Sequence, residues 1–397
     1  MQISTDKDKI EELLTRGVEA IYPDRKFLEK RLKSGKQLTL YTGYDPTAPT
    51  LHIGHGITLI KLRQFQELGH KIIFLVGDFT GMIGDPTDKS AARQKLTRKE
   101  VLENAKGYKK QAESILDFKG DNPVELKYNS EWHDKMSFAD VIDLASHFTV
   151  QRMMERDMFQ DRLKNEKPIY VHEFMYPLMQ GYDCVAMDVD GEVGGNDQTF
   201  NMLAGRTLMK AMKNKEKFVM TSRLLVDTSG KKMGKSEGNM VALSDASEEM
   251  FGKVMSWSDE MIVPALGSCT RVPGPEIDEM AEAMKAGDNP RDFKLRLAFE
   301  ITKAFLGEKA AKKGQDHFAT VIQGKDKPED IPEMKLKATD IVSALVEAKL
   351  CKSKSEARRN IDGGGVRVND TKIEAYDHKV KSGDLIQKGK RHFVRVK

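Results

Sequence analysis

Two short segments carry residues suited to phosphate chemistry. The first is "HIGH" at 52–55, where His52 and His55 stand at i and i+3 with Gly54 between them, at the expected start of a helix that follows an apolar strand. A helix N-terminus attracts phosphate oxygens, and glycine allows a nucleotide to approach the backbone closely. Imidazoles can add hydrogen bonds to phosphate or ribose oxygens. The pattern predicts a nucleotide site, with a metal pair as the alternative.

The second segment is "KKMGKS" at 231–236, which supplies Lys232, Lys235 and Ser236 on a glycine-flanked stretch. Two ammonium groups beside a hydroxyl can stabilise the negative charge of a departing pyrophosphate as the transition state forms. Taken alone, a lysine-rich stretch also suits an ordinary solvated surface. Its combination with "HIGH" about 180 residues earlier is much more specific than either segment.

Together these segments resemble the HIGH and KMSKS motifs of class I aminoacyl-tRNA synthetases. Gly234 stands where the generic motif has serine, a replacement that also occurs among tyrosyl enzymes. The resemblance implies a Rossmann-like catalytic domain and activation of an amino acid by ATP. Such activation needs neither a nucleophilic side chain nor a general base, because the enzyme positions the reactants and stabilises charge.

Three further segments indicate which amino acid is bound. "YTGYDPT" at 41–47, "YPLMQGYD" at 176–183 and "GGNDQ" at 194–198 resemble the tyrosyl-tRNA synthetase family. Tyr41 and Asp183 are thereby implied to bind the phenolic hydroxyl, and a site built for that hydroxyl rejects phenylalanine because Phe would leave it unpaired. Tyr176 and Gln180 stand at i and i+4, so on a helix they share one face. The resemblance implies that these two residues and Asp85 hold the substrate ammonium, and that the surrounding pocket includes Gly43, Asp45, Thr80 and Gln198.

The same resemblance assigns the nucleotide contacts. Thr47 and His52 are implied to hold the γ-phosphate, and Gly54, His55, Thr58 and Asp197 the adenosine, with Asp45 and Asp197 as partners of the adenylate's polar groups. Lys89 and Arg93 are implied to help Lys232, Lys235 and Ser236 grip the pyrophosphate, although ordinary surface charge is the alternative for the first two. Mg²⁺ is expected to accompany ATP. No tightly bound cofactor and no protein metal site is predicted.

The elements that must position these residues follow from hydrophobic periodicity. We predict a helix over 8–34, a strand over 37–45, a helix over 54–69 and a strand over 71–78. Strand, helix and strand at this spacing make a right-handed βαβ unit with parallel strands. The α/β pattern continues to about residue 227, and helices follow from about 244 to 320. A catalytic domain over 1–240 and a helical, anticodon-side domain over 241–325 are predicted.

The last part of the chain is basic. Residues 335–397 hold 16 Lys and Arg against 8 Asp and Glu, a net charge of +8, so the rest of the chain carries −4 of the total +4. A linker over 326–335 and a small α+β domain over 336–397 are predicted, and this domain resembles the S4 type of RNA-binding domain. The resemblance implies phosphate contacts by Lys352, Lys354, Arg358 and Arg359, which give affinity rather than sequence readout.

Composition and length exclude other classes of protein. The charged N-terminus predicts no secretory signal, no apolar run is long enough for a membrane helix, and three widely spaced cysteines favour a reducing cytoplasm. The predicted partners are tRNA(Tyr), L-tyrosine, ATP and a second copy of the chain. Alternatives are a tryptophanyl-tRNA synthetase, a HIGH-bearing cytidylyltransferase and a non-catalytic RNA-binding protein derived from a synthetase.

Overall fold

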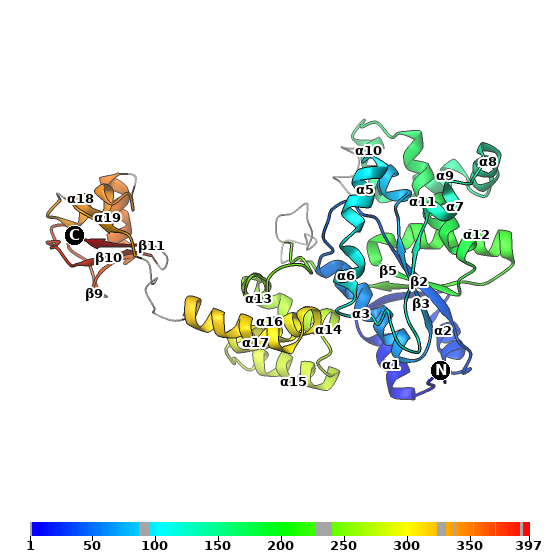
Figure 1. The fold of residues 1–397 in the computed structure, drawn as a ribbon, viewed down its shortest axis with the longest axis horizontal. Coiled ribbons are helices and arrows are strands. Elements are labelled where there is room, and N and C mark those ends of the chain that lie inside the picture. Colours follow the sequence, from blue (N-terminus) through cyan, green and yellow to red (C-terminus); the bar gives the residue numbers. More distant parts are fainter. Residues whose placement is uncertain are drawn as a thin grey trace. The chain divides into compact units, whose positions relative to one another are not determined.

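The computed structural model describes residues 2–86, 96–226, 240–323, 331–336, 338–351, 353–369, 371–389 and 392–397, with no side chains for 321–323. The chain divides into two compact units, residues 1–318 and 319–397 (Figure 1). In the described residues no helix is both long and apolar enough to cross a membrane.

The first unit is built on a twisted sheet. Among its described residues six strands pair in the order β1-β6-β5-β2-β3-β4. All neighbours are parallel except β1 and β6, which are antiparallel at one edge. The strands are β1 Val18–Tyr22, β2 Thr39–Tyr44, β3 Lys71–Val76, β4 Glu125–Tyr128, β5 Gly191–Gly195 and β6 Phe218–Ser222.

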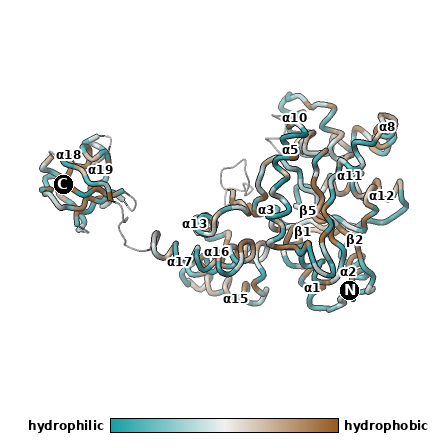
Figure 2. Tube along the Cα trace, in the orientation of Figure 1, coloured by the Kyte–Doolittle hydropathy of each residue, from teal (hydrophilic) through white to brown (hydrophobic). Residues whose placement is uncertain are grey.

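Apolar side chains of the central strands alternate between two cores, so helices cover both faces. In β3, Phe74 packs into the larger core with the helical part of the unit, while Ile73 and Leu75 pack with Tyr41 and helix α11. Figure 2 shows hydrophobic residues along these strands. The helices up to β6 are α1 Lys7–Thr15, α2 Arg25–Leu32, α3 Ile53–Glu67, α4 Thr80–Ile83, α5 Arg98–Ala105, α6 Tyr108–Ala112, α7 Ser130–His133, α8 Phe138–Ser146, α9 Val150–Met154, α10 Asp157–Lys164, α11 Val171–Met187 and α12 Thr199–Lys213.

The predicted parallel-sheet fold is confirmed, because β2, α3 and β3 form a parallel βαβ unit. The single helix predicted over 8–34 is wrong. Helix α1 stops at Thr15, Gly17 has a φ of 64°, and the next five residues form strand β1. A left-handed backbone cannot continue a helix, and the β-branched and aromatic residues of "VEAIY" suit the edge of a sheet.

Helices α11 and α12 lie side by side because glycines remove side chains where they cross. A Cβ atom on Gly181 would lie 3.0 Å from the backbone nitrogen of Gly205, and a Cβ on Gly205 would lie 2.7 Å from Lys217 Nζ. That ammonium forms a fully buried ion pair with Glu192 on β5. Its distance to the ring centre of Tyr41 is 5.7 Å. The pair therefore lies close to Tyr41, one of the predicted site residues.

The predicted helical region after about residue 244 is confirmed within the described residues. Its helices pack against α3: a Cβ on Gly56 would lie 2.6 Å from the Phe305 ring. They are α13 Ser247–Met255, α14 Ile262–Cys269, α15 Gly274–Lys285, α16 Pro290–Leu306 and α17 Glu308–His317.

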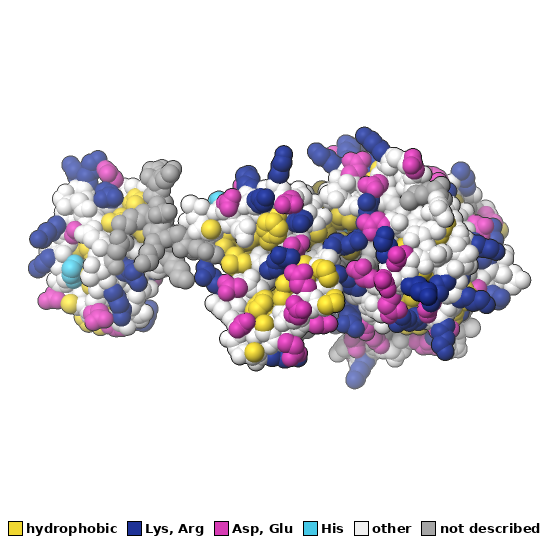
Figure 3. All heavy atoms as spheres, turned by 90° about the horizontal axis from the view of Figure 1, so that it is seen from below, with side chains coloured by type: hydrophobic (Ala, Val, Ile, Leu, Met, Phe, Trp, Pro, Cys, Tyr) yellow, Lys and Arg dark blue, Asp and Glu magenta, His cyan; other side chains and the backbone are white. Residues whose placement is uncertain are grey.

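The second unit is a small α+β domain with its own core. Its described strands pair in the order β7-β11-β10-β8-β9, and Lys and Arg side chains project from it in Figure 3. Residues 333–334, which we assigned to the linker, belong to this sheet because β7 pairs with β11. Its elements are β7 Glu333–Met334, α18 Ile341–Glu347, α19 Lys354–Asp362, β8 Val366–Val368, β9 Thr371–Lys372, β10 Leu385–Lys388 and β11 His392–Val396.

We predict that Lys217→Met lowers the free energy of unfolding by about 3–5 kcal/mol, because Glu192 would remain buried without its cation. Urea unfolding measures the effect. Replacing both partners, by Lys217→Met with Glu192→Leu, should recover most of the loss. The exposed pair of Lys285 and Glu282 gives the control, and Lys285→Met should leave stability unchanged. Equal effects at 217 and 285 would contradict this account.

Candidate active site

The predicted site residues gather at the carboxyl ends of the parallel strands. Strand β2 has β3 on one side and β5 on the other, so the order of connection reverses between β2 and β5. Ligands of open α/β sheets bind in the crevice outside such a switch point. Tyr41 and Gly43 lie on β2, and Asp197 and Gln198 lie in the turn that follows β5. The structure thus brings together segments about 150 residues apart.

One end of the crevice presents a carboxylate and a phenol. The carboxylate of Asp183, on α11, is buried and accepts hydrogen bonds from Trp132 Nε1 at 2.8 Å, His133 Nε2 at 2.8 Å and Asn129 Nδ2 at 3.3 Å. The Tyr41 hydroxyl is buried and has no hydrogen-bond partner of good geometry among the described residues.

Burial raises the pKa of Tyr41, and the negative charges of Glu192 and Asp183 add to that effect. The hydroxyl therefore keeps its proton. It can still donate and accept a hydrogen bond, and the carboxylate that influences it most is that of Glu192.

Helix α11 carries a second set of polar side chains predicted to belong to the site. Tyr176 and Gln180 lie one turn apart on α11, as predicted. Gln180 Nε2 donates to Glu192 at 3.3 Å, which leaves Gln180 Oε1 buried without a donor. Because an amide oxygen is acceptor-only, this atom needs an N–H or O–H from a ligand or water.

Asp45 is an acidic group of the site whose pKa is strongly raised. Its carboxylate accepts hydrogen bonds from Thr80 Oγ1 at 2.6 Å and Tyr176 at 2.8 Å. Burial raises the pKa of Asp45 to about 7, since these two hydroxyls offset only part of the desolvation and Asp85 and Asp183 are negative neighbours. Gly77 permits this arrangement, because a Cβ there would lie 1.9 Å from Asp45 Oδ1.

Asp85 is the third acidic residue of the site, after Asp183 and Asp45. It accepts a hydrogen bond from Gln198 Nε2 at 2.7 Å and lies 3.7 Å from Nη2 of Arg156. The Arg156 guanidinium is buried between the rings of Phe159 and Phe200. A cation here offsets part of the charge that Asp45, Asp85 and Asp183 bring to the pocket.

His52 and His55 form the N-terminal cap of α3. His52 Nδ1 accepts from the backbone of Gly54 at 3.1 Å, His55 Nδ1 accepts from the backbone of His52 at 3.1 Å, and the rings stack 3.9 Å apart. Each neutral ring therefore carries its proton on Nε2. Thr58 is buried, and its hydroxyl is bonded to Tyr44 and to the backbone of His55.

Backbone pairing ties this cap to the residues that follow the second motif. Ile53 donates to the carbonyl of Val241 at 2.9 Å, and Leu243 donates to the carbonyl of Leu51 at 2.9 Å. His52 and Ala242 form an antiparallel bridge. Of the other predicted residues, Thr47 is exposed beside Asp45, while Lys89, Arg93, Lys232, Lys235, Ser236 and Lys352 lie outside the described residues.

In the second unit, Lys354, Arg358 and Arg359 are exposed on α19. Arg358 lies over the ring of Tyr376, with 5.7 Å between its guanidinium carbon and the ring centre. An exposed helix with several cations can contact a polyanion through its phosphates.

Several residues of the site were missed from the sequence. One segment after β4 supplies the three donors to Asp183, which are Asn129, Trp132 and His133. The other missed residues are the buried pair of Lys217 and Glu192, Gly77 beside Asp45, and Arg156 beside Asp85. None belongs to a local motif that identifies its partner. A signal existed only in "NSEWH" at 129–133, where amide, indole and imidazole donors cluster.

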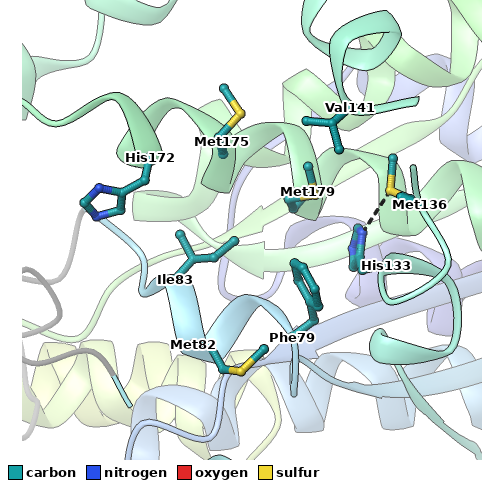
Figure 4. Close-up of a pocket in the computed structure, with 9 residues that line it drawn as sticks. All are labelled: Phe79, Met82, Ile83, His133, Met136, Val141, His172, Met175 and Met179. Carbon is teal, nitrogen blue, oxygen red and sulfur yellow. Dashed lines mark hydrogen bonds between the residues drawn. The ribbon is translucent and has the colours of Figure 1, made fainter. Parts of the chain in front are cut away.

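A cavity of about 360 Å³ borders this donor segment at His133 (Figure 4). Its lining is mainly apolar, and His133 joins it to the Asp183 carboxylate. It is lined by Phe79, Met82, Ile83, His133, Met136, Val141, His172, Met175 and Met179.

Comparison with known proteins identifies the family of the chain. The family model described as "tRNA synthetases class I (W and Y)" matches residues 33–323, and the model of the "Tyrosine--tRNA ligase SYY-like C-terminal domain" matches residues 323–396. A tyrosine--tRNA ligase of Thermotoga maritima is 45% identical over 97% of this chain and 96% of its own length. That of Haemophilus influenzae is 43% identical over 99% and 98%.

Solved structures share the fold. A C-terminally truncated mitochondrial tyrosyl-tRNA synthetase of Aspergillus nidulans superposes with a TM-score of 0.65 at 24% identity, covering 79% of this chain and 94% of the other. The enzyme of Archaeoglobus fulgidus complexed with L-tyrosine gives 0.61 at 23% identity, covering 78% and 99%. With both family models and full-length relatives in agreement, the chain belongs to the class I tRNA synthetases and, among them, to the tyrosine--tRNA ligase family.

Proposed function

We propose that this chain activates L-tyrosine with ATP, giving tyrosyl-adenylate and pyrophosphate, and then transfers the tyrosyl group to the 3′ end of tRNA(Tyr). One observation carries the assignment of tyrosine: Tyr41 Oη on β2 and Gln180 Oε1 on α11 are both buried without a hydrogen-bond partner among the described residues, and we assign them to the two ends of one amino-acid site. A buried polar group without a partner is costly, so a pocket that keeps two is complementary to a ligand with polar groups at both ends.

A phenol satisfies the first end. Its O–H donates to Oδ2 of Asp183, and its oxygen accepts from the hydroxyl of Tyr41. Phenylalanine would leave both groups unpaired, which is the basis of strong discrimination. Tryptophan fits less well, because an indole N–H can donate to Asp183 but offers Tyr41 no acceptor.

The substrate ammonium satisfies the second end. It donates to Gln180 Oε1 and lies among Asp45, Asp85 and Tyr176. A cation beside Asp45 favours the ionised carboxylate, whose pKa is raised to about 7 by burial. The ammonium and this carboxylate therefore stabilise each other.

The nucleotide is placed at the start of α3. His52 and His55 donate through Nε2 to phosphate or ribose oxygens beside Gly54, and Thr47 and Asp197 complete the contacts. The tyrosine carboxylate attacks the α-phosphorus, and Lys232, Lys235 and Ser236, with Lys89 and Arg93, stabilise the leaving pyrophosphate. ATP enters with Mg²⁺ as substrate. Among the described residues no group of three or more His, Cys, Asp or Glu could hold a metal ion.

The second unit is proposed to bind tRNA through its basic helix. Lys354, Arg358 and Arg359 are exposed, and the net charge of residues 335–397 is +8. Phosphate contacts of this kind orient the nucleic acid and make binding depend on salt.

A homodimer is proposed from an unusual surface. Six large apolar side chains are exposed on α8 to α11 or directly before α11, and they include Phe138 at 80% and Val171 at 76%. We call these six residues the apolar face. Helices α8 and α11 contact each other, so its two ends belong to one part of the unit. Such exposure suits a covered interface. The apolar face consists of Phe138, Ile142, Val150, Leu163, Tyr170 and Val171.

ATP–pyrophosphate exchange without tRNA tests the function. Exchange should depend on tyrosine and be absent with phenylalanine and tryptophan. Tyr41→Phe should reduce the ratio of kcat/KM for tyrosine over phenylalanine about tenfold, because one of the two groups that recognise the phenol is lost. It should not lower the stability of the free protein, since the missing hydroxyl had no partner.

Tyr108→Phe is the matched control. This buried hydroxyl donates to the carbonyl of Ala48 at 2.8 Å, so its removal should cost about 1 kcal/mol of stability and leave selectivity unchanged. Exchange with tryptophan in place of tyrosine would overturn the pocket assignment.

Asp45→Asn tests the charge balance of the ammonium end. The folded-state pKa of about 7 lies above the ordinary value of 3.8, so the carboxyl stabilises the fold below pH 4 and loses that contribution as pH rises through 7. The parent without substrate should therefore lose stability between about pH 4 and 7 relative to Asp45→Asn, in urea unfolding. The variant should also bind tyrosine more weakly at pH 8. Parallel pH profiles would argue against this.

The dimer is tested by Val171→Asp combined with Phe138→Asp. Two carboxylates buried in the contact should shift the protein to monomers in sedimentation velocity at micromolar concentration. Met212→Asp, a partly exposed position on α12 outside the apolar face, should remain dimeric. A parent that sediments as a monomer at this concentration would refute the proposal.

A further inference from the structure

The two oxygens of Asp183 are used unequally. Oδ1 accepts two hydrogen bonds of 2.8 Å, from Trp132 and His133, whereas Oδ2 accepts one longer bond of 3.3 Å from Asn129. An ionised carboxylate oxygen has about two acceptor positions, so Oδ1 is saturated and Oδ2 retains capacity. The donors therefore determine which oxygen a ligand can reach.

His133 contributes to this arrangement from an apolar setting. Its side chain is fully buried, and its ring lies 5.0 Å from that of Phe79 and 5.9 Å from that of Tyr182. Nδ1 faces the sulfur of Met136 at 3.5 Å, a weak partner, as Figure 4 shows. Because an ionised carboxylate only accepts, Nε2 must carry the proton in the bond to Asp183.

We propose that His133 is a positioning residue for amino-acid selection: its Nε2–H holds Oδ1 of Asp183, so that the carboxylate stays ionised and presents Oδ2 to the phenol of the substrate. This inference rests on the proposed binding of tyrosine. The segment after β4 thereby determines substrate choice without touching the substrate.

The electrostatics of the site support this role. Burial raises the pKa of Asp183, and the hydrogen bond and charge of His133 oppose that rise, followed by the bonds from Trp132 and Asn129. The other titratable groups that interact with Asp183 are Tyr41, Asp45, Tyr176 and Cys184, which are all neutral or acidic. Loss of His133 should therefore leave Asp183 protonated at higher pH.

The test compares His133→Leu, which removes the donor, with His133→Gln, whose amide N–H can replace Nε2–H. His172→Leu is the matched control, because His172 lines the same cavity but has no bond to Asp183. All variants carry Trp257→Phe, which leaves Trp132 as the sole tryptophan. The measurements are tyrosine-dependent pyrophosphate exchange at pH 6–9 and the pH titration of Trp132 fluorescence in the free protein.

We expect His133→Leu to raise KM for tyrosine about tenfold with kcat nearly unchanged, because one charge-assisted hydrogen bond is lost. The midpoints of the acid limb of 1/KM and of the fluorescence titration should both move up by about one pH unit. His133→Gln should restore most of both, and His172→Leu should match the parent. If His133→Leu does not fold, His133→Asn, whose amide is too short to reach, should show the same defects.

Parental values of KM and of the titration midpoint in His133→Leu would overturn the inference. So would equal defects in the Leu and Gln variants with a parental midpoint, because that result indicates a packing role. Absence of exchange in the parent itself would instead refute the proposed function, and the fluorescence titration would still report whether His133 controls Asp183.

Discussion

The site depends on how one pocket accommodates buried carboxylates. Glu192 is paired with a fully buried lysine, Lys217. Asp183 accepts hydrogen bonds from three N–H donors, and Asp45 from two hydroxyls. Each arrangement offsets part of the cost of burying charge, and the pKa of Asp45 nevertheless stays raised to about 7. Negative charge therefore prevails around Asp45, which suits the amino-acid ammonium proposed above.

The surrounding elements hold these groups at fixed positions. Helix α11 carries Tyr176, Gln180 and Asp183 along one side of the crevice, and its close contact with α12 through Gly181 and Gly205 fixes its height above the sheet. Polar groups that are already oriented need no reorganisation when a ligand arrives, which favours both affinity and selectivity. This arrangement depends on the close backbone contact between Gly181 and Gly205, which a side chain at either position would disturb.

Local patterns in the sequence were sufficient for the main features. The periodicity of residues 37–78 predicted the parallel βαβ unit, and the i, i+4 spacing of Tyr176 and Gln180 placed both on one face of a helix. Contacts between distant segments were not predictable in this way. The bonds to Asp183 join residues about 50 positions apart.

Sequence reasoning was also wrong where tertiary context prevailed. The apolar residues of 8–34 recur at helical spacing, yet Val18–Tyr22 in the middle of that stretch form strand β1 and pair with β6. The buried pair of Lys217 and Glu192 was missed for a related reason, since charged residues on strands usually indicate a solvated face. Such errors arise because the sequence of one segment does not reveal which distant residues pack against it.

The main-chain ladder between residues 51–53 and 241–243 has a consequence for how such sequences diverge. It links the first signature segment to the residues that follow the second through N–H and C=O groups, and every residue except proline possesses both. Val241, Ala242 and Leu243 are buried, so substitutions at these positions are limited to apolar residues of similar size. The backbone bonds themselves require no particular amino acid. A library randomised at these three positions could therefore be enriched in many functional combinations, provided that proline and charge are left out.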